Sequence, residues 1–160
     1  MRLGEAVRTG ALAGLGGAAA VTTANLIEQQ LFLPRNEPFE IEPIEVAKTE
    51  ARNAGHPLST GGQWAAGTAA HLAYSALWGA IYGVAQRRLR LPHLLHGVVF
   101  GEIIWALNYP RWGILPQRGI LPPAGERSRT RALIPLGTHA VFGLATAALF
   151  QLLSRHADRG

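Results

Sequence analysis

Four ionisable side chains lie inside segments that are otherwise nearly free of charge: Glu28, His71, Glu102 and His139. An ionisable group within a membrane span costs about 2.5 to 3.5 kcal/mol on insertion scales for Asp, Lys or Arg, which makes it a functional candidate by default. Two imidazoles and two carboxylates that face one another can bind a divalent metal ion. They can also pass protons, because histidine titrates near neutral pH.

Four apolar segments carry these residues, near positions 9–33, 64–86, 93–115 and 132–153. The segment from Trp64 to Gln86 contains no carboxylate, Lys or Arg, and it is followed by Arg87 and Arg88. At about 1.5 Å of rise per helical residue, it spans the roughly 30 Å hydrocarbon layer of a bilayer. The sequence therefore predicts an all-α fold, in which residues 1–160 form one integral membrane domain, a bundle of four transmembrane helices.

The charged residues gather between these segments and at the two ends of the chain. Residues 34–63 form a polar loop with five glutamates, in which the part from Ile44 to Ala54 is predicted to be a short surface helix. Residues 116–131 form a Pro- and Arg-rich loop. We expect both long loops on the outer face and both termini in the cytoplasm, because three arginines in the 87–90 turn resist translocation.

Composition also limits the possible partners and chemistry. Charged residues make up 16% of the chain, against roughly 25% of a typical soluble domain. The absence of cysteine excludes disulfides and thiolate metal ligands. The formal charge of +5 comes from arginines that flank apolar segments, so we predict lipid headgroups as their partners and no nucleic acid.

Pairs of glycines at helical spacing give smooth helix faces, as in Gly10-xxx-Gly14 and Gly97-xxx-Gly101. Such faces let another helix approach closely, so they favour a homo-oligomer or a place in a larger membrane complex. The first segment has one alternative interpretation, a cleaved secretory signal within residues 1–24. A retained helix is favoured because apolar character resumes from Leu26 to Leu33, which is too long for a signal core.

The four ionisable residues are predicted to lie at one depth. His71 and His139 lie about 10 Å below the face where their segments begin, and Glu28 and Glu102 lie similarly far before the ends of segments that run the other way. Helical spacing adds a second set of polar and aromatic neighbours, Asn25, Ser75, Trp78, Tyr82, Trp105, Tyr109 and Thr146. The remaining histidines, His56, His93, His96 and His156, are expected at the wet interfaces.

Three interpretations of this layer stay open. It can be a structural hydrogen-bonded plug, a divalent metal or haem site, or a site that handles protons or substrate. No Walker loop, nucleophile elbow, HExxH or dinucleotide motif occurs in the sequence, so a binding or transport-accessory protein is favoured over an enzyme. The alternatives are a metal- or haem-dependent membrane enzyme or redox subunit that acts on a lipid or quinone, and a purely structural subunit of a larger complex.

Several short motifs resemble those of the YagU-like family of small bacterial inner-membrane proteins. They are a Glu before an LPR turn, the spacing H-xxx-S-xxx-G-xx-Y that begins at His71, a P-xx-G turn from Pro110 to Gly113, and a GTH-xx-F start to the last segment. The resemblance covers most of the chain and implies a four-span protein of the bacterial inner membrane, with Glu28, His71 and His139 at matching positions. Glu102 departs from the family pattern, and the activity of the family is undefined.

Overall fold

The computed structural model describes residues 1–89 and 91–157, and within this part it is all-α, without strands, as predicted. In chain order the helices are α1 (Leu3–Phe32), α2 (Glu42–Asn53), α3 (Thr60–Leu89), α4 (His93–Asn108), α5 (Ile114–Gln117), the 3-10 turn η1 (Ala124–Glu126) and α6 (Arg129–Ala157). The surface helix predicted near 44–54 is confirmed as α2. His156 cannot be placed at an interface, because its side chain lies outside the described part.

Prolines set two of the helix ends. The last residue of α1 is Phe32, and its C-cap Leu33 is extended because it precedes Pro34, whose ring disfavours helical geometry in the residue before it. The segment predicted to be helical over 93–115 is helical only to Asn108. There the chain turns, and the Gly113 amide donates to the Pro110 carbonyl at 2.6 Å. A side chain at 113 would press on the backbone of Asn108, so the P-xx-G motif forms a tight turn.

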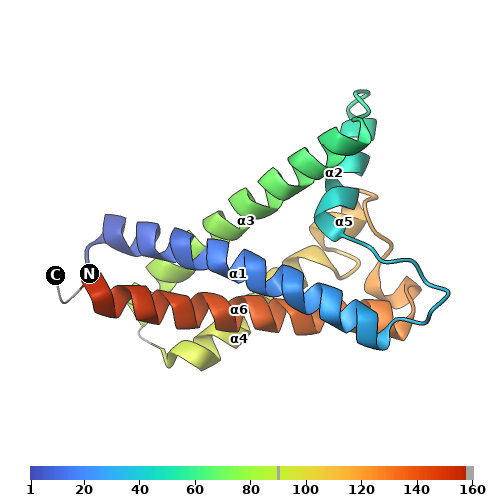
Figure 1. Cartoon of the computed structure of the whole chain (residues 1–160). Helices are drawn as coiled ribbons and strands as arrows, with labels where there is room; N and C mark the ends of the chain where they lie inside the picture. Colours follow the sequence, from blue (N-terminus) through green and yellow to red (C-terminus); the bar gives the residue numbers. More distant parts are fainter. Residues whose placement is uncertain (90, 158–160) are drawn as a thin grey trace.

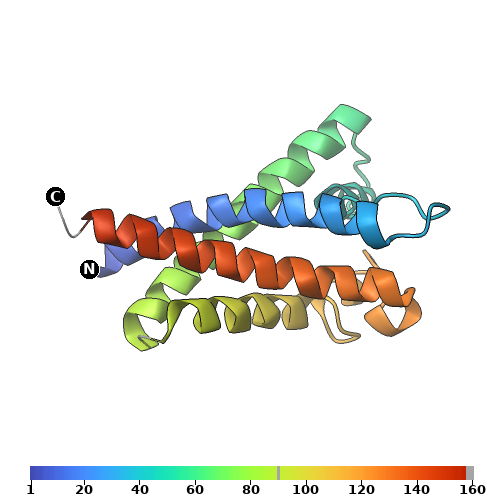
Figure 2. The ribbon, with the colours of Figure 1, turned by 60° about the horizontal axis from the view of Figure 1, so that its bottom comes forward.

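The four long helices are arranged around a central antiparallel pair. α1 and α6 lie side by side, α3 crosses α1, and α4 runs along α6 (Figures 1 and 2). The first turns of α1 and the last turns of α6 lie at one end of the molecule, which we call the terminal end. The segments 33–59 and 109–128 lie at the opposite end, which we call the loop end.

Glycines allow the two lateral helices to approach this pair closely. A Cβ at Gly14 of α1 would overlap the carbonyl of Ser75 on α3, and a Cβ at Gly101 of α4 would overlap the carbonyl of His139 on α6. Gly10 and Gly97 likewise face backbone of α3 and α6. The glycine faces that we assigned to oligomer contacts are therefore occupied by helices of the same chain, because close helix approach within one chain uses the same small residues.

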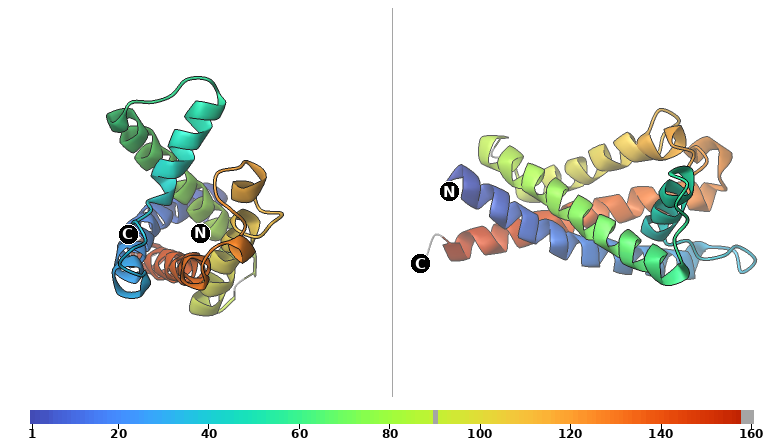
Figure 3. Two further views of the ribbon diagram at one scale, coloured as in Figure 1. Left: turned by 90° about the vertical axis from the view of Figure 1, so that its right-hand side faces the viewer. Right: turned by 90° about the horizontal axis from the view of Figure 1, so that it is seen from above.

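The core lies nearer the terminal end. It consists of Tyr82, Phe100, Ile104, Phe142 and Phe150 with two alanines, and Tyr82 is completely buried. Towards the loop end, α3 diverges from α1 and α6, and α2 packs on it (Figure 3). The backbone of Pro43 and Ile44 rests against Gly67 there. Because α2 joins the divergent end of α3, the polar loop 34–59 is held against the bundle.

Outside this core, the long helices expose large apolar side chains. Leucine and isoleucine are exposed on α1, α3, α4 and α6, for example Leu31, Leu77, Leu95 and Leu133. Among the described residues, α1 and α6 are long and apolar enough to cross a membrane by length and composition. α3 and α4 do not meet that criterion, and α4 has only 16 residues.

Candidate functional site

Each of the two histidines of the predicted layer is hydrogen-bonded to a neutral oxygen. His71 Nε2 lies 3.3 Å from Thr22 Oγ1, and the Thr22 hydroxyl lies 2.8 Å from the Ala18 carbonyl, to which it donates. His139 Nδ1 donates to the Pro135 carbonyl at 2.7 Å. The two imidazoles are close enough for their charges to interact. Among the described residues, no hydrogen bond or ion pair joins either histidine to a carboxylate, so the pairing that we expected is not found there.

The two glutamates of that layer do not complete a metal site. The carboxylate oxygens of Glu28 lie 3.0 Å from the position that a Cβ on Gly137 would take, so Glu28 packs on α6 beside the histidine turn. Within residues 1–89 and 91–157, no three His, Asp or Glu side chains are grouped so that they could hold a metal ion. The four-ligand arrangement of Glu28, His71, Glu102 and His139 is thus not assembled. Equal depth fixes a residue's level along a helix, but it does not fix the direction of its side chain around that helix.

The predicted neighbours of the layer mostly belong to the core or to the loop end. Ser75 and Thr146 are buried, and the ring of Trp78 packs edge-on against Tyr74 and Phe100. Tyr82 stacks on His96 with 4.7 Å between ring centroids. The buried Nε1 atoms of Trp78 and Trp105 and the Thr146 hydroxyl have no hydrogen-bond partner in the described part.

His96 is buried, with 6% of its surface exposed, so the expectation of a wet interfacial histidine is wrong. Its Nδ1 is hydrogen-bonded to Gln86 Oε1, and the same glutamine donates Nε2 to the Leu91 carbonyl at 2.7 Å. An amide oxygen only accepts, so His96 carries its proton on Nδ1. The burial follows from the short connection after α3, which folds the first turns of α4 against Tyr82.

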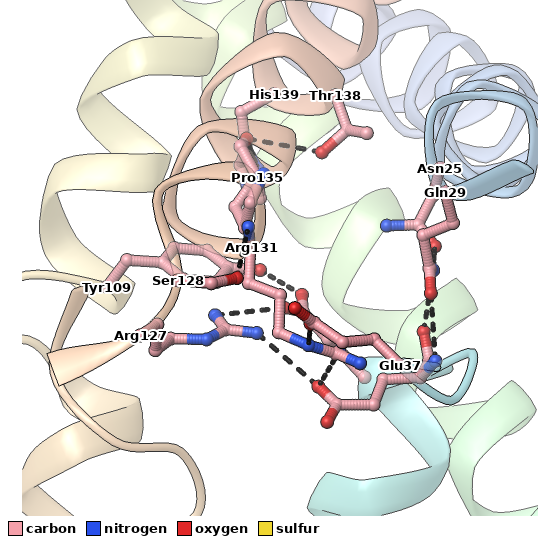
Figure 4. A network of polar contacts seen from close by, with 12 residues as sticks. Asn25, Gln29, Glu37, Tyr109, Arg127, Ser128, Arg131, Pro135, Thr138 and His139 are labelled. Carbon is pink, nitrogen blue, oxygen red and sulfur yellow. Dashed lines mark hydrogen bonds and ion pairs between the residues drawn. The ribbon is translucent and has the colours of Figure 1, made fainter. Parts of the chain in front are cut away.

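A charged cluster at the loop end was not anticipated as a unit. We call Glu37, Glu40, Glu42, Arg127 and Arg131 the loop charge cluster. Figure 4 shows three of its members, Glu37, Arg127 and Arg131, near Tyr109 and His139. The two arginine side chains are only 7% and 13% exposed. Arg131 Nε lies 2.5 Å from Glu37 and its Nη1 lies 3.0 Å from Glu40. Arg127 lies 3.4 Å from Glu40 and 3.7 Å from Glu42.

The side chain of Gln29 connects this cluster to α1. Its Nε2 donates to the Glu40 carbonyl at 2.8 Å, and its Oε1 accepts from the Glu40 amide at 2.8 Å. Gln29 Nε2 also donates to Asn25 Oδ1, so Asn25 belongs to this network rather than to the histidine layer. A cavity of about 10 Å³ lies between these side chains and Pro135, close to the roughly 10–15 Å³ that one water molecule needs.

Tyr109 connects the loop charge cluster to the histidines. It follows the last residue of α4 and is buried. Its hydroxyl donates to the Glu42 carboxylate, and its ring meets the ring of His139 edge-on with 5.3 Å between centroids. In order from the loop end, the ionisable groups are therefore Glu42, Tyr109, His139 and His71. No sequence pattern pointed to the Tyr109–Glu42 bond, since 67 residues separate the two.

Burial and ion pairing shift the pKa values of two carboxyl groups of α2 in opposite directions. Burial raises the pKa of Glu42 above its usual value, and the Tyr109 hydrogen bond and Arg127 only partly oppose it. Hydrogen bonds from Arg118 lower the pKa of the partly exposed Glu50. The one sequence signal for the cluster was its opposite charges. Three glutamates lie at 37–42 in one loop and two arginines lie at 127 and 131 in another, and both loops were predicted on the same face.

The geometry is thus a half-buried pair of histidines joined through Tyr109 to a nearly closed group of paired charges. Among known proteins, no family model, no curated protein and no solved structure matches this chain.

Proposed function

We propose that the chain is a four-span integral membrane protein in which α1, α3, α4 and α6 all lie within the bilayer. The distribution of side-chain sizes supports this. Many leucine and isoleucine side chains are exposed on all four helices, while glycine, alanine, serine and threonine lie in the contacts between helices around an aromatic core. Helices in lipid pack through small residues and place large apolar side chains against the acyl chains.

The proposed location is the inner membrane of a bacterium, with the loop end outside and the terminal end in the cytoplasm. The resemblance to the YagU-like family supports the membrane. The charges support the orientation, because Arg118, Arg127 and Arg131 at the loop end are paired with glutamates. Within the described residues, no ion pair involves Arg87, Arg88 or Arg155 at the terminal end, so their charge remains available to hold that end in the cytoplasm.

The proposed function is proton-linked binding or accessory transport, without enzymatic chemistry. One observation carries this proposal: the Tyr109 hydroxyl bonds to Glu42 while the Tyr109 ring contacts His139. Glu42 retains its proton to higher pH than a free carboxyl because burial raises its pKa. A proton taken up at the loop end can pass between Glu42 and the Tyr109 hydroxyl, with the small cavity beside Glu42 as a place for one water. Because only the ring of Tyr109 contacts His139, the step from the hydroxyl to His139 and His71 requires a bridging water.

Proton uptake by proteoliposomes tests the proposal. A potassium diffusion potential drives protons inward, and a trapped pH dye reports them. The wild-type protein should acidify the lumen faster than protein-free liposomes do. Tyr109→Phe keeps the ring and removes only the hydroxyl, so it should slow uptake by about tenfold or more, since a positioned proton-transfer group contributes roughly 10²–10⁴ in rate.

Tyr74→Phe is the matched control. Its hydroxyl accepts a hydrogen bond from Asn108 at 2.9 Å, so the variant loses a comparable bond outside the proposed path. It should transport at the wild-type rate. Wild-type uptake equal to that of empty liposomes would overturn proton transport, and equal rates for the two tyrosine variants would overturn the path through Tyr109.

A further inference from the structure

An open cavity of about 1270 Å³ lies at the terminal end, away from the path described above. It is bounded by the end of α3, the turn into α4 and the last turns of α6. Its volume exceeds the roughly 300–1,000 Å³ of ordinary small-molecule pockets. The cavity can therefore hold a bulky headgroup together with the beginning of its chains.

The polar lining of this cavity is strongly basic. Arg87, Arg88 and Arg155 line it, and none of the described residues that line it is Asp or Glu. All the ion pairs found among the described residues involve Lys48, Arg118, Arg127 and Arg131, which lie in the loops or at the loop-end start of α6. His93 also lines the cavity, is close enough to Arg155 for their charges to interact, and has a buried Nδ1 without a partner in the described part. Three guanidinium groups and an imidazole thus face one space in which the described residues supply no carboxylate.

The remaining walls are apolar and continue onto the outside of the helices. Leu91, Pro92 and Phe150 line the cavity, and beyond it Leu94 and Leu95 are about 60% exposed on the first turns of α4. A ligand that fits must therefore combine negative charge with acyl chains. Basic pockets between membrane helices on the cytoplasmic side have this chemistry and hold anionic lipid headgroups.

We infer that this cavity is a binding site for the phosphate headgroup of an anionic phospholipid, held by Arg88 and Arg155 with its chains along α4. Guanidinium groups bind phosphate oxygens through charge-assisted, often bidentate hydrogen bonds, which exposed lysines match less well. The inference rests on the membrane placement proposed above, but it is independent of the proton path through Tyr109.

Native mass spectrometry of the protein in a neutral detergent tests the inference, with phosphatidylglycerol, phosphatidylcholine and inorganic phosphate as probes. Wild-type protein should bind phosphatidylglycerol about 30-fold more tightly than phosphatidylcholine, since an arginine near an anionic surface contributes about fivefold and two act together. Arg88→Gln with Arg155→Gln should abolish this preference, and Arg88→Lys with Arg155→Lys should restore part of it. The lysine pair shows that a loss arises from charge rather than from misfolding.

The matched control is Arg52→Gln with Arg129→Gln, which removes two exposed arginines from α2 and from the opposite end of α6. This variant should keep the wild-type preference. An equal loss in both glutamine pairs would overturn the site in favour of general surface charge. If the site bound inorganic phosphate but not phosphatidylglycerol, a lipid would be ruled out as the ligand. Stable insertion into phosphatidylcholine nanodiscs without any headgroup preference would overturn this inference while leaving the membrane placement intact.

Discussion

Gln86 and His96 hold the turn between α3 and α4 in one geometry. The glutamine oxygen accepts from His96 Nδ1, and its amide donates to the Leu91 carbonyl. Tyr82 covers the imidazole on one face, and its hydroxyl donates to the His93 carbonyl at 3.4 Å. A hydrogen bond of this kind makes only a small net contribution to stability. Removal of one partner is nevertheless costly, because the other group then remains buried without a partner.

Gln86→Leu should therefore lower the free energy of unfolding in detergent by about 1–3 kcal/mol, because His96 keeps a buried donor without an acceptor. The double change Gln86→Leu with His96→Phe should cost less, since a phenyl ring can stack on Tyr82 with no polar atom left unsatisfied. Thermal unfolding followed by circular dichroism measures both. Gln117→Leu is the control, because its Nε2 makes a similar bond to the Arg111 carbonyl on an exposed surface. A double variant less stable than Gln86→Leu would contradict the argument.

For single residues, the sequence predicted where polar side chains lie along the helices, but it did not predict their hydrogen-bond partners. His71 and His139 were predicted at one level, and their charges do interact. The prediction for His96 was wrong because a residue near the end of a segment was assumed to be exposed to water. The short turn after α3 instead folds the start of α4 back onto Tyr82. The bonds from Tyr109 to Glu42 and from Gln29 to Glu40 join residues in loops and helix ends, where no periodicity indicates direction.

Helix crossings at glycine determine how the four long helices fit together. Where α1 meets α3, a Cβ on Gly10 or Gly14 would overlap a carbonyl of the facing helix. The neighbouring atoms there are backbone, so they cannot move aside as the end of a flexible side chain would. The same arrangement recurs where Gly97 and Gly101 of α4 meet α6.

Gly14→Ala should destabilise the protein by about 1–3 kcal/mol or more, because overpacking at a helix contact forces the backbones apart. Gly4→Ala is the matched control in the same helix, since nothing lies within 4 Å of the position of its Cβ. Removal of a flexible glycine there should stabilise the protein by about 0.5–1 kcal/mol. Thermal unfolding in one detergent gives both values. Similar effects of the two substitutions would show that Gly14 is not at a close contact.

Hydropathy and charge predicted the number and approximate extent of the long helices, because those features depend on local composition. They did not predict the end of α4 at Asn108, which is followed by Pro110 and a turn at Gly113. Hydropathy and charge also did not predict which helices pack against each other. Gly10 and Gly14 indicated a close neighbour, but the same pattern fits a helix of a second copy as well as α3.

For the whole molecule, the distribution of paired and unpaired arginines determines the orientation we expect. Simple counting of Lys and Arg gives seven residues for the terminal end and eight for the loop end, so it does not decide. In the structure, several loop-end arginines have glutamate partners, and Arg127 and Arg131 are nearly buried with theirs. A paired, buried arginine offers less charge to resist translocation than Arg87, Arg88 and Arg155 at the terminal end.

The absence of cysteine makes this orientation directly measurable. Gly4, Gly61 and Gly125 have nothing within 4 Å of the position of a Cβ, so a cysteine fits at each without disturbing the packing. With four spans, Gly61→Cys and Gly125→Cys should react with a membrane-impermeant maleimide added outside intact cells. Gly4→Cys should react only after the membrane is permeabilised. If positions 61 and 125 reacted from opposite sides, α3 and α4 would not both span the bilayer. If both reacted only after permeabilisation, the four helices could still span, but the termini would lie outside and the basic cavity would face the outer leaflet.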